Sequence, residues 1–385
     1  MIPYGRQDIT AEDVAAVVAT LQSDFLTQGP AIPRFEQALA DYCGAAHAVA
    51  VCNATAALQM ACAALGLGPG DRLWTSPNTF VASANCGLYC GATVDFVDID
   101  PRSYNISVSA LEARLVSAEA AGTLPKIVIP VHFAGQSCDM QAIHALGQRY
   151  GFHIIEDASH AVGGSYLDSR VGSCRYSDVT VFSFHPVKII TTGEGGMALT
   201  NDPRLAARME RFRSHGITRD PALMEGEADG PWYYQQIELG YNLRITDLQA
   251  ALGHSQLARL DDYVARRHVI RGRYEALLAG LPLITPWQSP DARSALHLYP
   301  IKIDPAGTAR SRREVFEGLR AAGVGVNVHY IPVHTQPHYL RLGFKAGDFP
   351  EAERYYAGAI SLPMFPTLTE AQQDEVVAAL RRLLA

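Results

Sequence analysis

Short apolar runs alternate with amphipathic stretches through the first half of this 385-residue chain. Five of the runs have the length and composition of buried strands: Ala48–Val51, Arg72–Thr75, Val94–Val97, Lys126–Val131 and His153–Glu156. The stretches between them, such as Ala56–Leu65, have apolar residues at helical spacing. This alternation is typical of βαβ units, and it predicts an α/β fold whose central sheet is mostly parallel and flanked by helices.

Helix boundaries are also visible in the pattern. Thr10–Asp13 has the form of a capping box that opens an amphipathic helix, and the Gly-Pro ending of Asp24–Pro30 indicates a loop. A long helical pattern follows Gly240–Ala250 and reaches about Leu278. A helix of that length can bridge two domains, and the chain is too long for one small core. We therefore predict a large domain at 1–256 and a smaller one at 257–385.

The second half mixes strand and helix signals again. They comprise an apolar run at His297–Ile303, a helix from Ser311, the segment Gly325–Pro332, a short run at Ser361–Met364 and a final amphipathic helix from Glu370. No internal repeat of solenoid length is present. The smaller domain is therefore predicted to be α/β as well.

Composition excludes several classes of protein. The net charge of -7, with no run of Lys or Arg, argues against a general nucleic-acid binder. Seven cysteines without a CxxC pair fit a reducing compartment, and Cys86 and Cys90 are expected in the core and not on a metal. The first residues have no signal-peptide pattern, and no apolar run is long enough to span a bilayer. We expect a cytoplasmic protein with no metal, nucleic-acid or membrane partner.

Familiar short motifs are missing. The chain has no GxGxxG, no P-loop, no HExxH and no GxSxG. A nicotinamide-dependent oxidoreductase would need the first of these, so that reading is weak.

In a parallel sheet, ligands bind beyond the carboxyl ends of the strands, so the residues there are the candidates for chemistry. Asn53, Ala54 and Thr55 follow the first strand and place free N–H groups at a helix N-terminus, where a phosphate binds well. Taken alone, an ordinary N-cap explains them better. Phe80 follows the second strand, and its default interpretation is a core aromatic.

Polar residues also follow the later strands. His132 and Gln136 could be satisfied polar residues near a turn. Asp157 ends an apolar run, with His160 one helical turn further on. A buried carboxylate needs a cationic partner, since an isolated buried charge is very costly. Lys188 could be that partner in a purely structural ion pair.

Lys188 follows another apolar run, Val181–Phe184, and precedes the small residues Thr191–Gly196. No other Lys or Arg lies near it in the sequence. An amine delivered by a hydrophobic strand is partly desolvated, which disfavours its charged form and suits Schiff-base chemistry. The glycines and hydroxyls after it would let the backbone approach a ligand closely. A surface lysine with a buried stem is the simpler explanation of such a residue on its own.

Taken together, these residues resemble a family. The motifs are Asn53–Leu58, Glu156–His160, Ser183–Lys188, Thr192–Gly196 and Gly240–Arg244, in that order. In this set the chain resembles the DegT/DnrJ/EryC1/StrS nucleotide-sugar aminotransferases, which use pyridoxal 5'-phosphate and have the fold-type I, aspartate-aminotransferase-like architecture. The likeness runs from Tyr4 to about Pro366.

The resemblance implies roles for individual residues. Lys188 would hold the cofactor as a Schiff base, and Asp157 would pair with its pyridinium nitrogen. Phe80 would stack on the ring, and His160 would support it. Ala54, Thr55 and Ser183 would hold the phosphate, joined by Asn242 from a neighbouring subunit of a homodimer. The residues expected to contact the nucleotide-sugar are Tyr4, Asp24, Phe25, Leu26, Thr27, His329, Tyr330, Ile331 and Pro332.

The resemblance also implies a reaction. Some family members have histidine in place of the lysine and are dehydratases, so Lys188 favours transamination. Asn53 stands where many relatives have serine or glycine, which leaves its side chain without an assigned role. Three stretches resemble enzymes that make UDP-4-amino-4,6-dideoxy-N-acetyl-β-L-altrosamine for pseudaminic acid: Asp24–Gln28, Phe212–Ile217 and Val328–Pro332.

The expected reaction has two stages. L-glutamate would give its amine and leave as 2-oxoglutarate, and the amine would then pass to C4 of a UDP-linked 4-keto-6-deoxy-N-acetylhexosamine. Lys188 would move the proton in both stages. Two alternatives are the same chemistry on a dTDP- or GDP-linked sugar, including a perosamine-type substrate, and a non-catalytic sugar-binding homologue.

Overall fold

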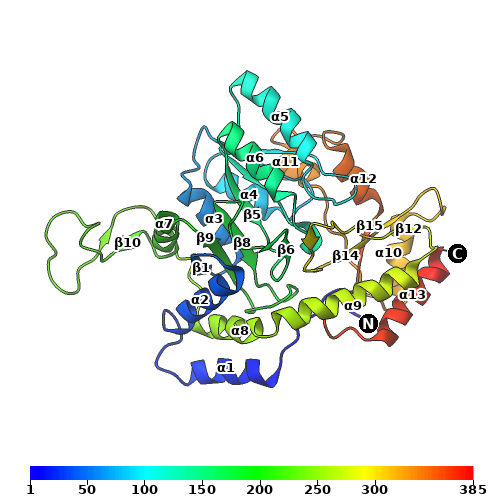
Figure 1. The fold of residues 1–385 in the computed structure, drawn as a ribbon, viewed down its shortest axis with the longest axis horizontal. Coiled ribbons are helices and arrows are strands. Elements are labelled where there is room, and N and C mark those ends of the chain that lie inside the picture. Colours follow the sequence, from blue (N-terminus) through cyan, green and yellow to red (C-terminus); the bar gives the residue numbers. More distant parts are fainter. Residues whose placement is uncertain (385) are drawn as a thin grey trace.

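A seven-stranded sheet lies at the centre of the computed structural model, which describes residues 1–384 (Figure 1). Its strand order is β1-β9-β8-β5-β4-β2-β3. The strands are β1 His47–Val51, β2 Arg72–Thr75, β3 Thr93–Phe96, β4 Ile127–Ile129, β5 His153–Asp157, β8 Val179–Ser183 and β9 Gly196–Thr200. Only β9 runs against its neighbours β1 and β8, so the predicted mostly parallel sheet is confirmed.

Each strand presents alternate side chains to two different helical layers, because successive residues of a strand point to opposite faces. Leu73 and Ile127 pack with α3 and α4 on one face, whereas Trp74 and Val128 pack with α5 and α6 on the other. The helices of this part are α1 Ala11–Leu21, α2 Ala31–Cys43, α3 Ala54–Ala64, α4 Ala82–Tyr89, α5 Val108–Ala121, α6 Met140–Tyr150 and α7 Pro203–Arg213. Both faces are therefore covered, as the apolar character of the strands requires.

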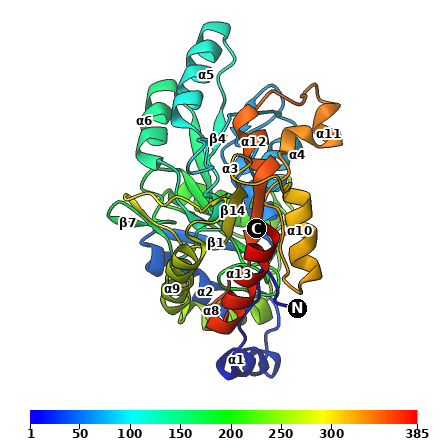
Figure 2. The same ribbon diagram turned by 90° about the vertical axis from the view of Figure 1, so that its right-hand side faces the viewer.

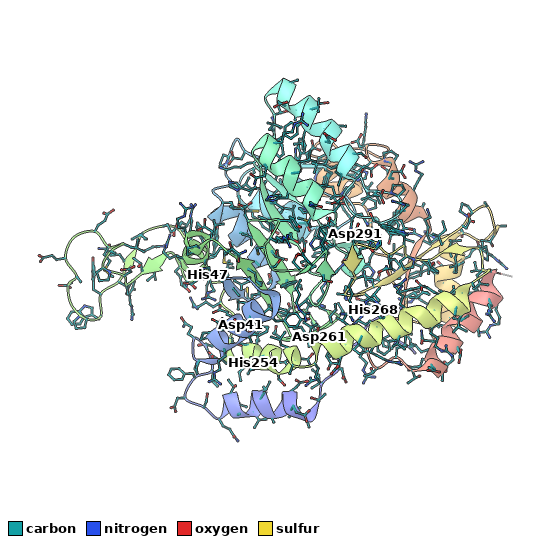
Figure 3. All side chains as sticks on the ribbon, in the orientation of Figure 1. Asp41, His47, His254, Asp261, His268 and Asp291 are labelled. Atoms are coloured by element: carbon teal, nitrogen blue, oxygen red, sulfur yellow. The ribbon has the colours of Figure 1, made fainter. Side chains whose placement is uncertain are left out.

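The long helical pattern after Gly240 forms two helices and not one, which corrects the expectation from the sequence. A capping box of Thr246 and Gln249 opens α8, Asp247–Leu257, and α9 covers Leu260–Leu278. Two interactions fasten the start of α9 to the sheet-bearing part: Asp261 accepts hydrogen bonds from Tyr42 (2.6 Å) and Arg170 (3.1 Å). Asp261 is labelled in Figure 3, where α9 then runs away from that part of the molecule.

The C-terminal residues build a second apolar core on the far half of α9 (Figure 2). It contains Ile270 and Tyr274 of α9 together with residues of a three-stranded sheet of order β12-β14-β15. Its elements are β12 Leu283–Ile284, β14 Tyr299–Ile303, α10 Arg312–Ala321, β15 Ala359–Leu362 and α13 Glu370–Leu384. The helix α12, Pro350–Gly358, packs in a different cluster with Phe96 and Tyr104. The division at residues 256 and 257 stays a prediction.

Smaller elements complete the chain. The two-residue strands are β6 Ser165–Tyr166, β7 Ser169–Arg170, β10 Ile217–Thr218, β11 Gln235–Gln236 and β13 Ala292–Arg293, and the short helices are η1 Phe133–Gly135, η2 Val333–Thr335 and α11 Pro337–Leu340. The segment around β10 and β11 projects from the rest of the molecule (Figure 1) and exposes Trp232 and Leu239. Within residues 1–384, no helix combines the length and apolar character needed to cross a membrane.

Candidate active site

A cavity of about 570 Å³ opens at the carboxyl ends of β5 and β8, beside the N-terminus of α3. Most of the predicted site residues line it: Tyr4, Ala54, Thr55, Phe80, Asp157, His160, Ser183, Lys188, His329 and Tyr330. Phe80 is 59% exposed, so its default interpretation as a core aromatic is wrong. Its ring is free to lie against a flat ligand.

Asp157 is the buried last residue of β5. Its backbone is fixed by His132 N–H, which donates to its carbonyl at 3.0 Å, and its carboxylate accepts from Ser83 Oγ at 2.6 Å and from the N–H of Ser159 at 3.2 Å. Among the ion pairs of residues 1–384 there is none between Asp157 and Lys188. A structural ion pair therefore does not account for the two residues, and the carboxylate is available to a cationic group of a ligand.

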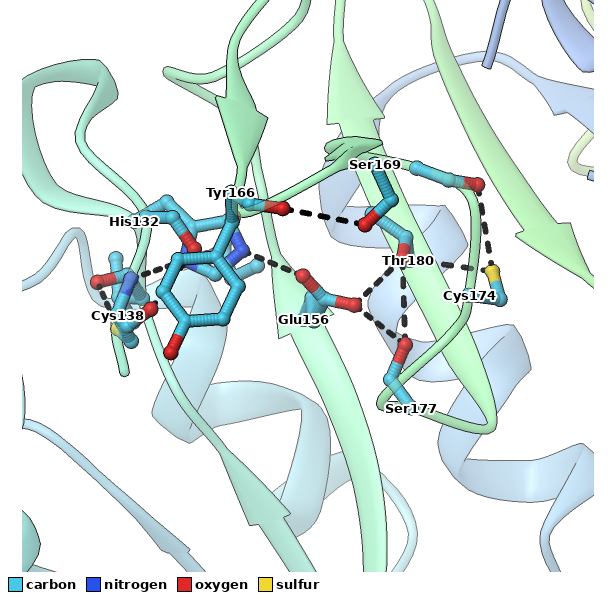
Figure 4. A network of polar contacts seen from close by, with 12 residues as sticks. His132, Cys138, Glu156, Tyr166, Ser169, Cys174, Ser177 and Thr180 are labelled. Atoms are coloured by element: carbon cyan, nitrogen blue, oxygen red, sulfur yellow. Dashed lines mark hydrogen bonds and ion pairs between the residues drawn. The ribbon is translucent and has the colours of Figure 1, made fainter. Parts of the chain in front are cut away.

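A second buried carboxylate, Glu156, stabilises the strand behind Asp157 (Figure 4). Its Oε2 lies 2.6 Å from His132 Nε2, and its Oε1 accepts from Ser177 at 2.5 Å and Thr180 at 3.1 Å. These hydrogen bonds and the neighbouring His132 outweigh desolvation, so the pKa of Glu156 lies below its ordinary value. The network joins the segment after β4 to β5 and β8, next to Asp157 in the chain.

Lys188 lies in the loop after β8, where its N–H donates to His185 C=O at 2.8 Å. Desolvation lowers the pKa of its amine from 10.5 to about 8, although the charge of Asp157 opposes this shift. Only the neutral amine is a nucleophile. At pH 7 about a tenth of Lys188 is therefore neutral, far more than for an ordinary lysine, as suits Schiff-base chemistry.

The N-terminus of α3 borders the other end of the cavity. Asn53 caps it by accepting from Ala56 N–H at 2.8 Å, so both the capping and the phosphate-binding interpretations of this turn remain compatible. Within residues 1–384 the N–H groups of Ala54 and Thr55 have no acceptor. Gly196 lies against this turn, since a Cβ on it would be 2.5 Å from Ala54 N. Free N–H groups beside a small residue suit a phosphate.

The donor set fits pyridoxal phosphate. It combines a buried carboxylate for a pyridinium nitrogen, an amine of lowered pKa for an aldehyde, an exposed ring for stacking and free N–H groups for a phosphate. The expected close approach of Thr191–Gly196 to a ligand stays a prediction. The hydroxyls of Thr191 and Thr192 donate to carbonyls of Phe184 and Glu194, so these two side chains are used within the chain.

Some predicted residues do not line this cavity. Asp24, Phe25, Leu26 and Thr27 are exposed and lie beside the start of α8, where Leu26 C=O accepts from Asp247 N–H at 3.0 Å. Ile331 is exposed, Pro332 is buried, and Asn242 is exposed next to the end of β1. Their roles stay predictions, and Asn242 was predicted to act from a neighbouring subunit.

Several cavity residues had no role in the sequence-based prediction: Thr79, Ser159, His185, Glu194, His297, Asn327 and Val328. Ser83, which holds Asp157, was also missed. Ser159 and His185 lie inside the motifs, so spacing could have found them. His297 reaches the cavity from the segment before β14, and nothing in its local sequence indicates this.

Comparisons with known proteins agree with this geometry. The profile of the DegT/DnrJ/EryC1/StrS aminotransferase family matches residues 7–381. The chain is 42% identical to the spore coat polysaccharide biosynthesis protein SpsC of Bacillus subtilis, covering 100% of this chain and 97% of SpsC. It is 39% identical to the GDP-perosamine synthase of Caulobacter vibrioides, covering 92% and 91% of the two chains.

Solved structures of related proteins also match this chain over its whole length. PseC of Helicobacter pylori, an aminotransferase of pseudaminic acid biosynthesis, superposes with a TM-score of 0.91 at 29% identity over 100% of this chain and 99% of PseC. The sugar aminotransferase Spr1654 of Streptococcus pneumoniae, solved in a pyridoxamine-phosphate form, superposes with a TM-score of 0.89 at 28% identity, covering 100% and 99%. A pyridoxal-phosphate form of the same protein matches as well.

Proposed function

Because the chain belongs to the DegT/DnrJ/EryC1/StrS family of pyridoxal-phosphate-dependent sugar aminotransferases, we propose that it transfers an amino group from L-glutamate to C4 of a nucleotide-linked 4-keto-6-deoxy sugar. The observation that carries this proposal is the cavity that joins Lys188 to Asp157 and to the free N–H groups of α3. One cavity thus contains an amine, a carboxylate and a helix N-terminus that can bind an anion.

When bound, pyridoxal phosphate supplies an electron-accepting ring that stabilises negative charge on the carbon next to the amine. Asp157 would keep the ring nitrogen protonated, because a carboxylate held by Ser83 and Ser159 is a fixed negative charge. Phe80 would stack on the ring, and His160 would support the cofactor from the same cavity. Ala54, Thr55 and Ser183 would bind the phosphate.

Lys188 would have two tasks. It would attach the cofactor, and once displaced by the amino donor it would move the proton from the donor's α-carbon to the C4′ carbon of the cofactor. A base that must also act as an acid works best with a pKa near the working pH. Burial brings the pKa of Lys188 to about 8, which meets this requirement.

For the sugar, we propose a UDP-linked 4-keto-6-deoxy-N-acetylhexosamine, giving UDP-4-amino-4,6-dideoxy-N-acetyl-β-L-altrosamine. The likeness to PseC over the full chain supports it. Tyr4, His329 and Tyr330 would contact this substrate from the cavity. The 39% identity to a GDP-perosamine synthase favours a second candidate, a GDP-linked 4-keto sugar.

We further propose a homodimer with shared active sites. Asn242, the loop Asp24–Thr27 and Ile331 are exposed, and the apolar side chains Phe25, Leu26 and Leu239 are exposed near them in the chain. A second copy of the chain would cover these side chains, and Asn242 of each copy would then reach the cofactor phosphate in the other. The seven cysteines are all unpaired in the structure, which suits the proposed cytoplasmic location.

A half-reaction screen tests the function. The protein is loaded with pyridoxamine phosphate, mixed separately with UDP-, GDP- and dTDP-linked 4-keto sugars, and followed by the return of the yellow aldehyde absorbance. We expect the UDP-linked N-acetyl sugar to react fastest, and a faster GDP-linked sugar would select the second candidate. Lys188→Ala should abolish both turnover and the absorbance of the Schiff base between Lys188 and the cofactor. A colourless protein that only binds nucleotide-sugar would contradict the proposal.

A further inference from the structure

His160, His297 and Tyr330 form one wall of the cavity. The ring centroids of His160 and His297 are 4.5 Å apart, and those of His160 and Tyr330 are 5.9 Å apart with planes inclined by 18°. Tyr330 Oη lies 2.9 Å from His160 Nε2. The ring centroid of Phe133 lies 6.2 Å from those of both His160 and Tyr330, so Phe133 packs against this pair and helps to hold it in place.

The hydrogen bonds of His160 fix the position of its proton. The N–H of Ala134 donates to His160 Nδ1 at 3.3 Å, so Nδ1 is an acceptor. Burial and the charge of Lys188 hold the pKa of His160 well below its ordinary value, and the neutral ring then has its proton on Nε2. Nε2–H therefore donates to Tyr330 Oη.

This assignment leaves the hydroxyl proton of Tyr330 without an acceptor among residues 1–384. Burial and the charge of Asp157 raise the pKa of Tyr330, so the hydroxyl keeps its proton. The neighbouring His329 is engaged elsewhere, because its Nδ1 lies 2.8 Å from Ser361 Oγ. Tyr330 thus presents an uncommitted neutral donor in the cavity that contains Lys188.

A ketone is present in this cavity in both half-reactions: the 4-keto sugar enters as one, and glutamate leaves as another, 2-oxoglutarate. The 4-keto carbon must accept an amine nitrogen, and in the reverse direction so must the keto carbon of 2-oxoglutarate. A donor on the carbonyl oxygen makes either carbon more electrophilic. We propose that Tyr330, oriented by His160, donates a hydrogen bond to the carbonyl oxygen of both ketones. The proton stays on Tyr330 in this interaction. The inference rests on the proposed chemistry at Lys188 but not on the identity of the sugar.

The first test separates ketone steps from the step in which no ketone is present. Tyr330→Phe is compared with wild type and with Tyr356→Phe, a matched loss of a hydroxyl on α12 outside the cavity. We expect Tyr330→Phe to slow the reaction of the pyridoxamine form with 2-oxoglutarate, and with the sugar, by about 100-fold. Cleavage of the α-C–H bond of glutamate, followed with α-deuterated donor, should change by less than about threefold. Equal slowing of ketone steps and C–H cleavage would overturn the proposal.

The second test does not depend on turnover. In Lys188→Ala protein loaded with pyridoxal phosphate, neither the protein nor the cofactor offers an amine in the cavity to condense with a ketone, and the stretching frequency of isotope-labelled bound ketone is measured there by infrared spectroscopy. We expect a lower frequency with Tyr330 present than in the Lys188→Ala/Tyr330→Phe double variant. Replacing Tyr330 with 3-fluorotyrosine, a stronger donor of nearly the same size, should lower the frequency further. Identical frequencies in all three proteins would refute the hydrogen bond.

The outcomes also distinguish this inference from the proposed function. If 2-oxoglutarate restores the yellow form but none of the 4-keto sugars does, the proposed substrate is wrong, and the Tyr330 comparison still proceeds with 2-oxoglutarate. If the sugars react but Tyr330→Phe matches wild type, the function stands and the role of Tyr330 is rejected.

Discussion

At the scale of single residues, the site depends on burial that changes the charge state of polar groups. Desolvation lowers the pKa of Lys188, whereas hydrogen bonds from Ser83 and Ser159 hold the carboxylate of Asp157 in place. The two residues act on each other through their charges without forming an ion pair. The sequence indicated both residues, because each follows an apolar run. It did not indicate Ser83, since a serine inside a small-residue helix has no distinctive local pattern.

The pKa of Lys188 predicts how cofactor attachment depends on pH. Imine formation needs the neutral amine, so its rate in cofactor-free protein should rise with pH and level off above about 8, measured by stopped-flow absorbance with pyridoxal phosphate. Because the charge of Asp157 raises the pKa of Lys188, Asp157→Asn should move the midpoint to lower pH. N-α-acetyl-lysine is the control, with a midpoint near the ordinary lysine value. A protein midpoint as high as that of the control would contradict the desolvation argument.

Ser83 should matter for both stability and rate. Its hydroxyl donates to the buried carboxylate of Asp157 and itself lies 2.7 Å from Thr79 Oγ1. Ser83→Ala removes a hydrogen bond to a charged group, which should cost about 1.5–3 kcal/mol in the free energy of unfolding and slow the glutamate half-reaction by about tenfold. Urea unfolding and single-turnover kinetics measure the two effects. Ser117→Ala, at an exposed serine of α5, should change neither, and a wild-type rate in Ser83→Ala would show that Asp157 does not need this donor.

At the scale of elements, strands were predicted better than helix boundaries. Four of the runs differ from the observed strands by one or two residues at one or both ends, and Arg72–Thr75 agrees fully, because a buried strand is apolar throughout. The prediction of one helical stretch from Gly240 to Leu278 was wrong, because helical spacing continues across the turn between α8 and α9. The antiparallel β9 was not predicted either, because strand direction is not encoded in a five-residue pattern.

The junction of β9 and α3 gives a prediction about an element boundary. Gly196 lies so close to Ala54 N that a Cβ would meet the backbone at 2.5 Å. Gly196→Ala should therefore push β9 away from the N-terminus of α3, lowering the free energy of unfolding by about 1–3 kcal/mol and weakening phosphate binding. Gly272→Ala is the matched control, because Gly272 lies in α9 with nothing within 4 Å of a Cβ, and alanine there should stabilise by up to about 1 kcal/mol. Urea unfolding and titration with pyridoxal phosphate measure both variants, and unchanged cofactor affinity in Gly196→Ala would refute the assignment of this turn.

At the scale of the whole molecule, the cavity is assembled from distant parts of the chain. Arg267 on α9 is 1% exposed and donates to the carbonyls of Leu296 (3.1 Å), His297 (3.2 Å) and Met364 (2.9 Å). It thus joins the C-terminal core to the segment that carries His297 into the cavity. Contacts of this kind cannot be read from local sequence, since the partners are backbone carbonyls tens of residues away. In the proposed homodimer, a second copy of the chain would bring the predicted residues outside the cavity, Asn242 above all, to the site.

Mixing two inactive variants tests whether the active site is shared between subunits. Lys188→Ala should be inactive, and Asn242→Ala should bind the cofactor phosphate poorly. If Asn242 serves the neighbouring site, a mixed dimer has one site with both defects and one site with neither. Equal amounts of the two variants, unfolded together and refolded, should then recover about a quarter of the wild-type sites, because half of randomly paired dimers are mixed. Size-exclusion chromatography checks that dimers form. Recovery no greater than the sum of the separate variants would mean that Asn242 acts within its own chain, or not at all, and the shared-site proposal would be rejected while the roles of Lys188 and Asp157 would remain open to their own tests.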